Sequence, residues 1–409
     1  MRKLFFGFLP LFIFQGVGAE DTPCPPFASP QDVLVCVRKN HPDVLRAEAE
    51  AANLDAYDAF ARQRPNPELD AEAVSNSEED EAALSAEASY LHTFELGGKR
   101  RHRLDRAKAQ KEAVLARVQK TREEVTLSAV LNLYRLRHLQ DELHAVEEAQ
   151  NTFSTIVGQY KNRRQLSPEQ QVSLNVFLLA QSDYSLRKSR LLQEQRALKR
   201  YFDLATGADF RTILKTLPAP KAAWPGLAAT PSIAGALRKE AQADLALAQA
   251  ELALADSDAR PDLKLGPKAG MESGRGRKNR SLGGALSLDL PLYQQNQGAR
   301  ALARTEARRA EVNLAQRDRE LSAQWQTWFE VYQDAVVSLR GMPSLEQMEK
   351  KHQGMESLFE RGLVQSALVI EAHRQMTDFA ESLNAQELRA LEALWSIYIL
   401  QGRALVEGL

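Results

Sequence analysis

The sequence predicts a mostly α-helical fold with a small β part, and three observations support this prediction. Long segments repeat apolar residues at steps of three and four, which is the helical period. Short segments alternate apolar and polar residues, as half-buried strands do. The order of helix, strand pair, very long helix and return helix occurs twice, which is an internal repeat. We therefore predict two copies of one unit in a single elongated chain.

The composition excludes two classes of protein. The chain has 409 residues, with 53 lysines and arginines against 54 aspartates and glutamates, so its net charge is -1. A nucleic-acid-binding protein is expected to be strongly basic, and this chain is not. After the first twenty positions there is no run of about 20 apolar residues, which excludes a helical transporter. By composition alone, the chain looks like a soluble helical protein.

The first 19 residues have the form of a secretory signal peptide. Arg2 and Lys3 precede an apolar run from Leu4 to Phe14, and the small residues at 17–19 provide a cleavage site. The apolar run is too short to span a bilayer as an anchor. We therefore predict a signal peptide over 1–19, followed by an N-terminal leader over 20–41.

Two cysteines, Cys24 and Cys36, lie in this leader. In an exported and oxidising compartment, a disulfide between them would close a short loop and tie the leader to the first helix. A pair of free thiols is the alternative. A metal site is disfavoured, because no Cys-x-x-Cys spacing or nearby histidine accompanies them. We predict the disulfide, and no bound metal or cofactor.

The first unit is predicted over 42–206. Its first helix ends before Pro65, because proline has no N–H to donate and pushes the preceding residue out of the α region. The predicted elements are a helix over 42–64, strands over about 67–75 and 83–94, a long helix over 99–164 and a return helix over 168–204. The long helix would extend roughly 100 Å at 1.5 Å per residue.

The second unit, predicted over 232–405, has the same order. Pro261 ends its first helix, and Pro343 is expected to bend its long helix. Its predicted elements are a helix over 232–258, strands over about 262–271 and 281–290, a long helix over 298–361 and a return helix over 366–405. The Pro- and Gly-containing segment 207–231 is predicted to be a linker packed against the middle of the helices. The sparsely apolar helical seams favour helices around a wide, wet space over a dry core.

Each predicted strand has one polar and one apolar face. The charged residues that we select on the polar faces are Asp70, Glu72, Glu87, Lys264 and Lys268. Half-buried hairpins on a soluble core would give the same alternation, because the signal of a membrane barrel is weak in each segment. Four strands are too few to close a barrel, so a barrel would need strands from several chains.

The joints between strands and helices contain the most specific motifs. These are Asn66-Pro67-Glu68-Leu69, Phe94-Glu95-Leu96-Gly97-Gly98-Lys99-Arg100, Leu288-Asp289-Leu290-Pro291-Leu292-Tyr293 with Asn296-Gln297-Gly298, and Gly362-Leu363-Val364 followed by Val369-Ile370-Glu371-Ala372. With the signal peptide and the two units, they resemble the outer-membrane efflux proteins, the TolC-like outer membrane factors, from about Val33 to Leu405. The motifs at 94–100 and 167–169 are most similar to the branch that serves heavy-metal cation pumps.

The resemblance implies a homotrimer in the bacterial outer membrane with a long periplasmic extension. Each protomer would give four strands to a shared 12-stranded β-barrel and four helical segments to a trimeric α-helical barrel in the periplasm. Apolar strand faces would meet outer-membrane lipid, and the five charged residues selected above would line the lumen. The resemblance implies a passive exit duct of a tripartite efflux system, which receives substrate, here metal cations, from an inner-membrane pump and a periplasmic adaptor. A periplasmic adaptor or coiled-coil scaffold is the alternative.

Two helix-turn-helix tips are implied to bind the adaptor. Their residues are Gln165, Leu166, Ser167 and Pro168 at one tip and Arg361, Gly362, Leu363 and Val364 at the other. Gly362 suits a helix end because it adopts positive φ without strain, and Ser167 can cap the helix that Pro168 starts. The first tip has no glycine, and Gln365 and Leu368 stand where Ser and Asp are usual in the family. A solvated turn without a partner is the alternative.

The remaining charged and polar motifs do not indicate an enzyme. The basic cluster at the start of the first long helix is expected near inner-leaflet phosphates or on a solvated face; it comprises Lys99, Arg100, Arg101, His102, Arg103 and Arg106. The seven histidines show no HExxH or paired helical spacing, and Gly97-Gly98-Lys99 lacks the spacing of a phosphate loop. An exported enzyme is disfavoured, because no nucleophile and base can be identified.

Overall fold

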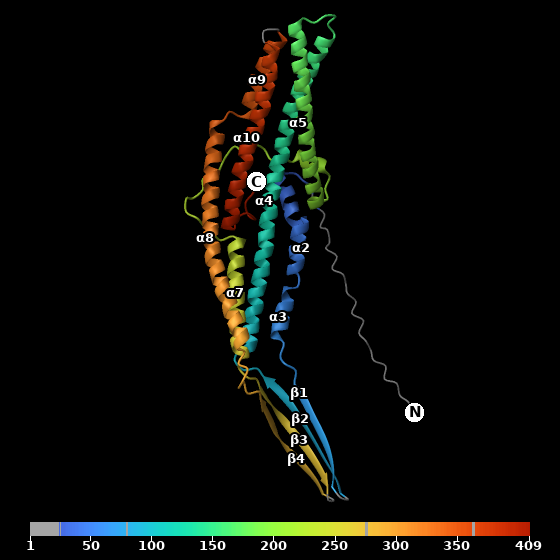
Figure 1. Cartoon of the computed structure of the whole chain (residues 1–409), viewed down its shortest axis with the longest axis vertical. Coiled ribbons are helices and arrows are strands. Elements are labelled where there is room, and N and C mark those ends of the chain that lie inside the picture. The colour runs from blue at the N-terminus through green and yellow to red at the C-terminus, as the bar shows by residue number, and fades with distance from the viewer. Residues whose placement is uncertain (1–23, 25, 79–80, 275–276, 362–364) are drawn as a thin grey trace, which may run out of the picture.

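The computed structural model describes residues 24, 26–78, 81–274, 277–361 and 365–409 (Figure 1). The predicted signal peptide lies outside the described residues. The helices form a long body, and a sheet extends beyond one end of it (Figure 1). In chain order the elements are α1 (Pro30–Asn40), α2 (Pro42–Ala51), α3 (Leu54–Arg62), β1 (Glu68–Glu78), β2 (Glu81–Phe94), α4 (Lys99–Lys161), α5 (Pro168–Thr206), α6 (Phe210–Lys215), α7 (Ala236–Asp258), β3 (Leu263–Gly274), β4 (Arg277–Leu288), α8 (Gln297–Gly341), α9 (Leu345–Glu360) and α10 (Ser366–Gln401).

The N-terminal part contains more helices than the sequence predicts. The expectation of a first helix starting at 42 is wrong, because α1 lies within the predicted leader. Ser29 and Asp32 form a capping box, and Pro30 occupies the first helical position, so the local signals for α1 are present. The predicted helix over 42–64 is divided into α2 and α3 by a turn at 52–53.

The second long helix is interrupted rather than bent. It ends as α8 at Gly341 and starts again as α9 at Leu345. Met342 is extended (φ -95, ψ 144), as expected for a residue before proline, and Pro343 has no N–H to continue the helix. Ser344 then caps α9 through a capping box with Gln347. Because Ser344 caps a new helix, the chain forms two separate helices here instead of one bent helix.

A hydrophobic core lies at the middle of the helical body. It is built on buried residues of α4, α8 and α10, with Trp325 and Trp395 among its largest side chains. The N-terminal helix α1 adds Val33, Leu34 and Val37, and α6 adds Phe210 and Ile213. Within the protomer, the helices therefore enclose a dry core at this level. The core closes because segments distant in sequence supplement the sparse apolar seams.

The segment between the two units packs against this core, around the middle of the body (Figure 1). Trp224 and Leu227 contact it, and the Tyr332 hydroxyl donates a hydrogen bond to the carbonyl oxygen of Pro225 at 2.6 Å. The backbone N–H of Lys221 donates to Glu387 Oε1 of α10 at 2.8 Å. Segment 207–231 thus contributes part of the core in addition to linking the units.

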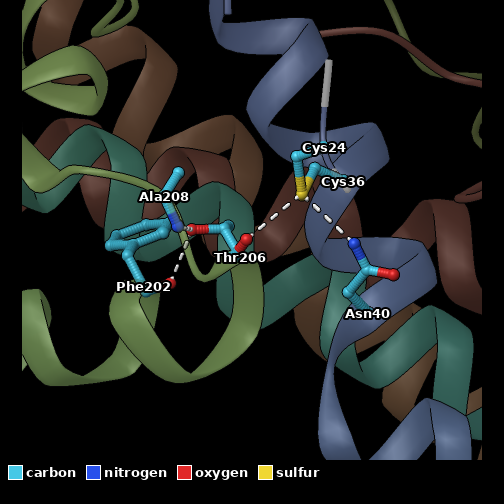
Figure 2. The surroundings of a disulfide bond; sticks show 6 residues. All are labelled: Cys24, Cys36, Asn40, Phe202, Thr206 and Ala208. Atoms are coloured by element: carbon cyan, nitrogen blue, oxygen red, sulfur yellow. Dashed lines mark hydrogen bonds between the residues drawn. A yellow bond between two sulfur atoms is a disulfide. The ribbon is translucent and has the colours of Figure 1, made fainter. Parts of the chain in front are cut away.

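Cys24 and Cys36 form a disulfide, with their Cα atoms 5.7 Å apart. Cys36 belongs to α1, and the Cys24 sulfur lies 3.3 Å from the carbonyl oxygen of Thr206 at the end of α5 (Figure 2). Asn40 Nδ2 donates to the same sulfur at 3.2 Å (Figure 2). The disulfide therefore holds the start of the described chain against both α1 and α5.

The four strands form one antiparallel sheet in the order β1-β2-β3-β4. The central pair, β2 and β3, comes from different units, so pairing across the repeat builds the sheet. At the hairpins each strand extends beyond its predicted end: β1 reaches Glu78, β2 starts at Glu81, β3 reaches Gly274 and β4 starts at Arg277. Polar residues continue the ladder there, because backbone hydrogen bonds do not require apolar side chains.

Candidate functional site

All five charged residues selected from the sequence lie on one face of the sheet. Asp70 pairs with Ser89, Glu72 pairs with Glu87, and Ser89 pairs with Lys268 in the next strand. Thr93 pairs with Lys264, which is an even number of residues from Lys268. Because paired residues point to the same side of a sheet and side chains alternate along each strand, the five residues share a single surface.

Oppositely charged residues on this face form ion pairs across strands. Lys268 Nζ lies 2.5 Å from Glu87 Oε2, and Lys264 forms an ion pair with Glu68. Glu68 was not selected from the sequence, although it precedes Asp70 and Glu72 in the same alternation. Exposed ion pairs contribute only about 0–1 kcal/mol each. Their main consequence is a charged, water-compatible surface.

The opposite face of the sheet is mainly apolar and exposed, and His92, Lys278 and Arg280 also lie on it. Its large exposed hydrophobic side chains are Leu69, Leu84, Tyr90, Phe94, Leu265, Met271, Leu282, Leu286 and Leu288. Leu282, near the middle of β4, is 87% exposed. An apolar surface that extends over four strands is typical of a site that meets another protein or a lipid.

Both outer strands are long and unpaired on one side within the described protomer. β1 has 11 residues and pairs with β2, and β4 has 12 residues and pairs with β3. Such edges present rows of free N–H and C=O groups that favour pairing with another strand. Neither face nor edge is covered by the helices, because the sheet projects beyond them (Figure 1).

Gly266 and Pro267 interrupt the central ladder. The β2–β3 pairing stops at Ser89 with Lys268 and resumes at His92 with Leu265. Proline at 267 cannot donate a ladder hydrogen bond. A Cβ at 266 would lie 1.7 Å from the Tyr90 carbonyl oxygen, so only glycine fits there. Close backbone approach therefore explains this glycine.

Three members of the basic cluster at the start of α4 form ion pairs inside the protomer. Lys99 Nζ lies 2.8 Å from Asp262, Arg106 lies 3.2 Å from Glu251 of α7, and Arg103 pairs with Glu95. Hydrogen bonding to Glu95 raises the pKa of Arg103. Lys99 and Arg103 are thereby mostly shielded from solvent, whereas Arg106 stays half exposed. The pairs of Lys99 and Arg103 connect α4 to residues next to the sheet, and the pair of Arg106 connects α4 to α7.

Glycines allow the chain to turn from β2 into α4. Gly97 and Gly98 both have positive φ (77° and 80°), and Gly98 is the N-terminal cap of α4. In the second unit Asn296 takes the same role at the start of α8 with φ 56°, and its Nδ2 donates to the Ala255 carbonyl at 2.9 Å. Asparagine adopts this conformation more readily than most residues.

The turn between α4 and α5, which contains the first predicted tip, and the end of α9 that leads to the second lie at the end of the body farthest from the sheet (Figure 1). At the first, Ser167 caps α5 in a capping box with Gln170, and Pro168 is at the first helical position. Leu166 packs against the core formed by α4 and α5, whereas Gln165 is exposed. At the second, Arg361 ends α9, and Gly362, Leu363 and Val364 lie outside the described residues.

A buried charged network joins α4, α10 and the inter-unit segment. Glu387 accepts hydrogen bonds from Arg137, from His138 Nε2 at 2.9 Å and from the Lys221 N–H at 2.8 Å. Burial opposes ionisation, but the hydrogen bonds from His138 and Arg137 prevail and lower the pKa of Glu387 to about 2. Burial lowers the pKa of His138. The sequence did not indicate this network, since its members are about 250 residues apart.

The chain has the fold of known outer-membrane channels. The sequence matches no protein-family model and no curated protein. Solved structures similar to it include the CmeC channel of Campylobacter jejuni, at 15% identity and a TM-score of 0.66, covering 92% of this chain and 86% of that one. VceC of Vibrio cholerae is 15% identical with a TM-score of 0.66, and the match covers 91% of this chain and 96% of that one. CusC is 13% identical with a TM-score of 0.68, and the match covers 92% of this chain and 93% of that one. In the part of the chain that the structure describes, no helix is both long and apolar enough to cross a membrane.

Proposed function

We propose that three copies of this chain form a passive exit channel in the bacterial outer membrane. Each copy would contribute its four strands to a closed 12-stranded barrel and its helices to a periplasmic tunnel. The observation that carries the proposal is the two-faced sheet, which is apolar and exposed on one side and charged on the other. In a membrane barrel, the apolar side faces lipid and the charged side faces a water-filled lumen.

The free strand edges support assembly into a trimer. Pairing β4 of one protomer with β1 of the next would satisfy both edges in a closed ring, which leaves no strand unpaired. The fold shared with the CmeC and VceC channels is consistent with this arrangement.

Exposed aromatic residues support a membrane boundary at the base of the sheet. Tyr90 and Phe94 lie at the end of β2 that joins the helices, and Tyr293, which follows β4, is 96% exposed. Aromatic girdles mark the edges of the apolar band in membrane barrels. The ion pairs of Lys99, Arg103 and Arg106 would then lie just outside this boundary.

We further propose that the channel serves a tripartite efflux system with a periplasmic adaptor and an inner-membrane pump. The adaptor would bind the tips at 165–168 and 361–364, which lie opposite the sheet. The proposal that the substrate is a metal cation rests on the sequence motifs at 94–100 and 167–169 alone. The similar structures do not distinguish the heavy-metal branch from the other branches of the family. No catalytic step is proposed. The alternative of an adaptor or scaffold does not explain the exposed apolar sheet.

Membrane fractionation combined with heat-modifiable gel migration tests the channel. We expect the protein in the outer-membrane fraction as a trimer that dissociates on heating, and we expect the purified trimer to conduct ions in planar bilayers. Recovery of the protein as a soluble periplasmic monomer would contradict the proposal.

Cysteine crosslinking tests the tips separately. Leu166→Cys and Leu363→Cys should capture a coexpressed cognate adaptor, whereas Leu204→Cys should not, because this exposed residue lies at the other end of α5. Equal capture at all three positions, or capture at none, would count against the tips as the adaptor site.

A further inference from the structure

Two buried histidines and a carboxylate converge between α9 and α10. His352 and Glu356 lie on one face of α9, and His373 belongs to α10. One ligand atom from each of the three residues lies within 4.8 Å of the others. The imidazole rings of His352 and His373 are 4.4 Å apart between centroids, in an edge-to-face arrangement. This cluster was not predicted, although the four-residue spacing of His352 and Glu356 was available in the sequence.

The histidine nitrogens are buried without hydrogen-bond partners. His352 is 3% exposed and His373 is 2% exposed. Both ring nitrogens of His352 and Nε2 of His373 make no hydrogen bond among the described residues. Glu356 Oε1 lies 3.2 Å from His373 Nε2 but outside hydrogen-bonding geometry. A buried polar atom without a partner is costly, so three of them in one cluster point to a bound ion or water.

Carboxylates surround the histidines and supply negative charge. Glu148 of α4 lies 3.9 Å from His352 Nδ1, and Glu349 of α9 joins the same group. His373 is also buried, and an imidazole nitrogen can coordinate a cation.

We propose that His352, His373 and Glu356 bind a divalent first-row transition-metal ion of the Zn²⁺ type. Two imidazoles and one carboxylate form a common zinc ligand set, and imidazole favours these metals over Mg²⁺ or Ca²⁺. Ligand atoms in a tetrahedral zinc site are roughly 3.4 Å apart, so the present atoms would move together by no more than about 1.4 Å.

The surrounding residues match the support that such ligands normally have. Nδ1 of His352 lies 3.9 Å from Glu148 without a hydrogen bond; with the ion on Nε2, a small approach of Glu148 would give the carboxylate–histidine–metal arrangement. Thr152 Oγ1 of α4 donates to Glu356 Oε1 at 3.1 Å and orients that carboxylate. The rings of Phe153 and His373 pack edge to face, with 5.3 Å between their centroids.

The ion would attach α9 to the rest of the protomer. Among the described α9 side chains, from 345 to 359, His352 is the one that is buried, and Phe359 packs, partly buried, against the core of α4 and α5, so this helix docks through a histidine and an apolar residue. Pro343 separates α9 from α8, so α9 is not held in place as a continuation of α8. A metal bound to α9 and α10, and supported by α4, would fix the helix that leads to the second tip.

Zinc binding to the purified full-length protein tests this site. After stripping with chelator, equilibrium dialysis against Zn²⁺ should give one ion per protomer, and Co²⁺ should give visible absorption bands of tetrahedral N/O coordination. We expect His352→Gln and His373→Gln to weaken binding by more than about 100-fold, the upper limit for loss of a supporting group. Glu356→Gln, whose side chain is 27% exposed, should also weaken binding while leaving the metal-free circular dichroism unchanged.

A matched control distinguishes this site from surface binding. His144→Ala removes an exposed histidine one helical turn from Glu148 and should leave affinity unchanged. Less than one ion per protomer, or equal affinity in wild type and all three ligand variants, would overturn the site. Loss of binding in His144→Ala alone would assign the ion to the surface and would also overturn it. These results do not depend on channel activity, so the site and the proposed function can fail separately.

Discussion

The helical body and the sheet use apolar residues in opposite ways. At the middle of the body, Leu391 and Trp395 are buried by segments of the same protomer, including α1 and the segment between the units. In the sheet, Leu282 and Leu286 alternate with small and polar residues, as the buried side of a strand would. Both are nevertheless exposed in the protomer. The body is therefore stabilised by the protomer itself, whereas the sheet needs a partner or a lipid to cover its apolar face. The same contrast applies to charges, which are buried at Glu387 and exposed at Glu87.

The largest expected effect comes from the buried network. Glu387→Gln should reduce the free energy of unfolding by about 3–5 kcal/mol, because the buried Arg137 loses its hydrogen-bonded carboxylate and keeps, among the described residues, only Asp141 at 3.9 Å. Guanidinium unfolding of the detergent-purified protein measures this. The matched change in the sheet, Glu87→Gln, removes an exposed ion pair and should cost no more than about 1 kcal/mol. Equal losses would contradict the contrast between body and sheet.

Leucine truncation compares the two apolar regions directly. Leu391→Ala should lower the free energy of unfolding by about 2–5 kcal/mol, since its side chain is fully buried in the core. Leu282→Ala should have little effect in the same unfolding assay in detergent, because it leaves no cavity inside the protomer. A large loss from Leu282→Ala would show that β4 is buried by protein instead of lipid or detergent.

Lysine substitution separates the two faces of β4. Leu282→Lys places a charge on the apolar face and should cost about 2–4 kcal/mol in a lipid bilayer if that face meets the membrane core. Ser281→Lys places the same charge on the polar face one residue away and should be tolerated. The assay is trimer recovery from the membrane and its thermal stability there. Equal tolerance of both substitutions would remove the main support for the barrel.

Acid should destabilise the body through Glu387 and His138. Because the folded pKa of Glu387 is lowered to about 2, the unfolded chain takes up its proton first as pH falls. This contribution, up to about 3 kcal/mol, is complete above about pH 4.3 and is lost toward pH 2. His138 has a lowered folded pKa, so its effect begins below about pH 6.5 and has the same sign. The free energy of unfolding, measured from pH 7 to 3, should show both losses. The Glu387→Gln variant should lack the loss at lower pH, which comes from Glu387.

Local patterns predicted the strand faces but not their partners. Alternation around Asp70, Glu87 and Lys268 was sufficient to assign them to polar faces, because side-chain direction follows from strand geometry. Their ion pairs required the register between β2 and β3, which come from units far apart in the sequence. Helix ends at proline and the Ser167 cap were predictable for the same local reason, and α1 was missed although its capping box is local.

Clusters formed by distant residues were not predictable. The disulfide was expected because two cysteines in an exported chain leave one intramolecular pairing, which the structure contains. The Glu387 network and the His352–His373 pair combine residues from separate helices, so no periodicity relates them. Pro343 signalled a disturbance, but the extent of the break depended on Ser344 and on where α9 docks.

The sequence by itself determined the helical and strand periods, the internal repeat, the turns and the polarity of each strand face, because these depend on residues a few positions apart. Only the tertiary structure decided which faces are buried, which charges pair and where the two histidines meet. The physical reason is that burial and pairing depend on how helices and strands pack across hundreds of residues, and packing is set by the whole assembly of side chains rather than by any one segment.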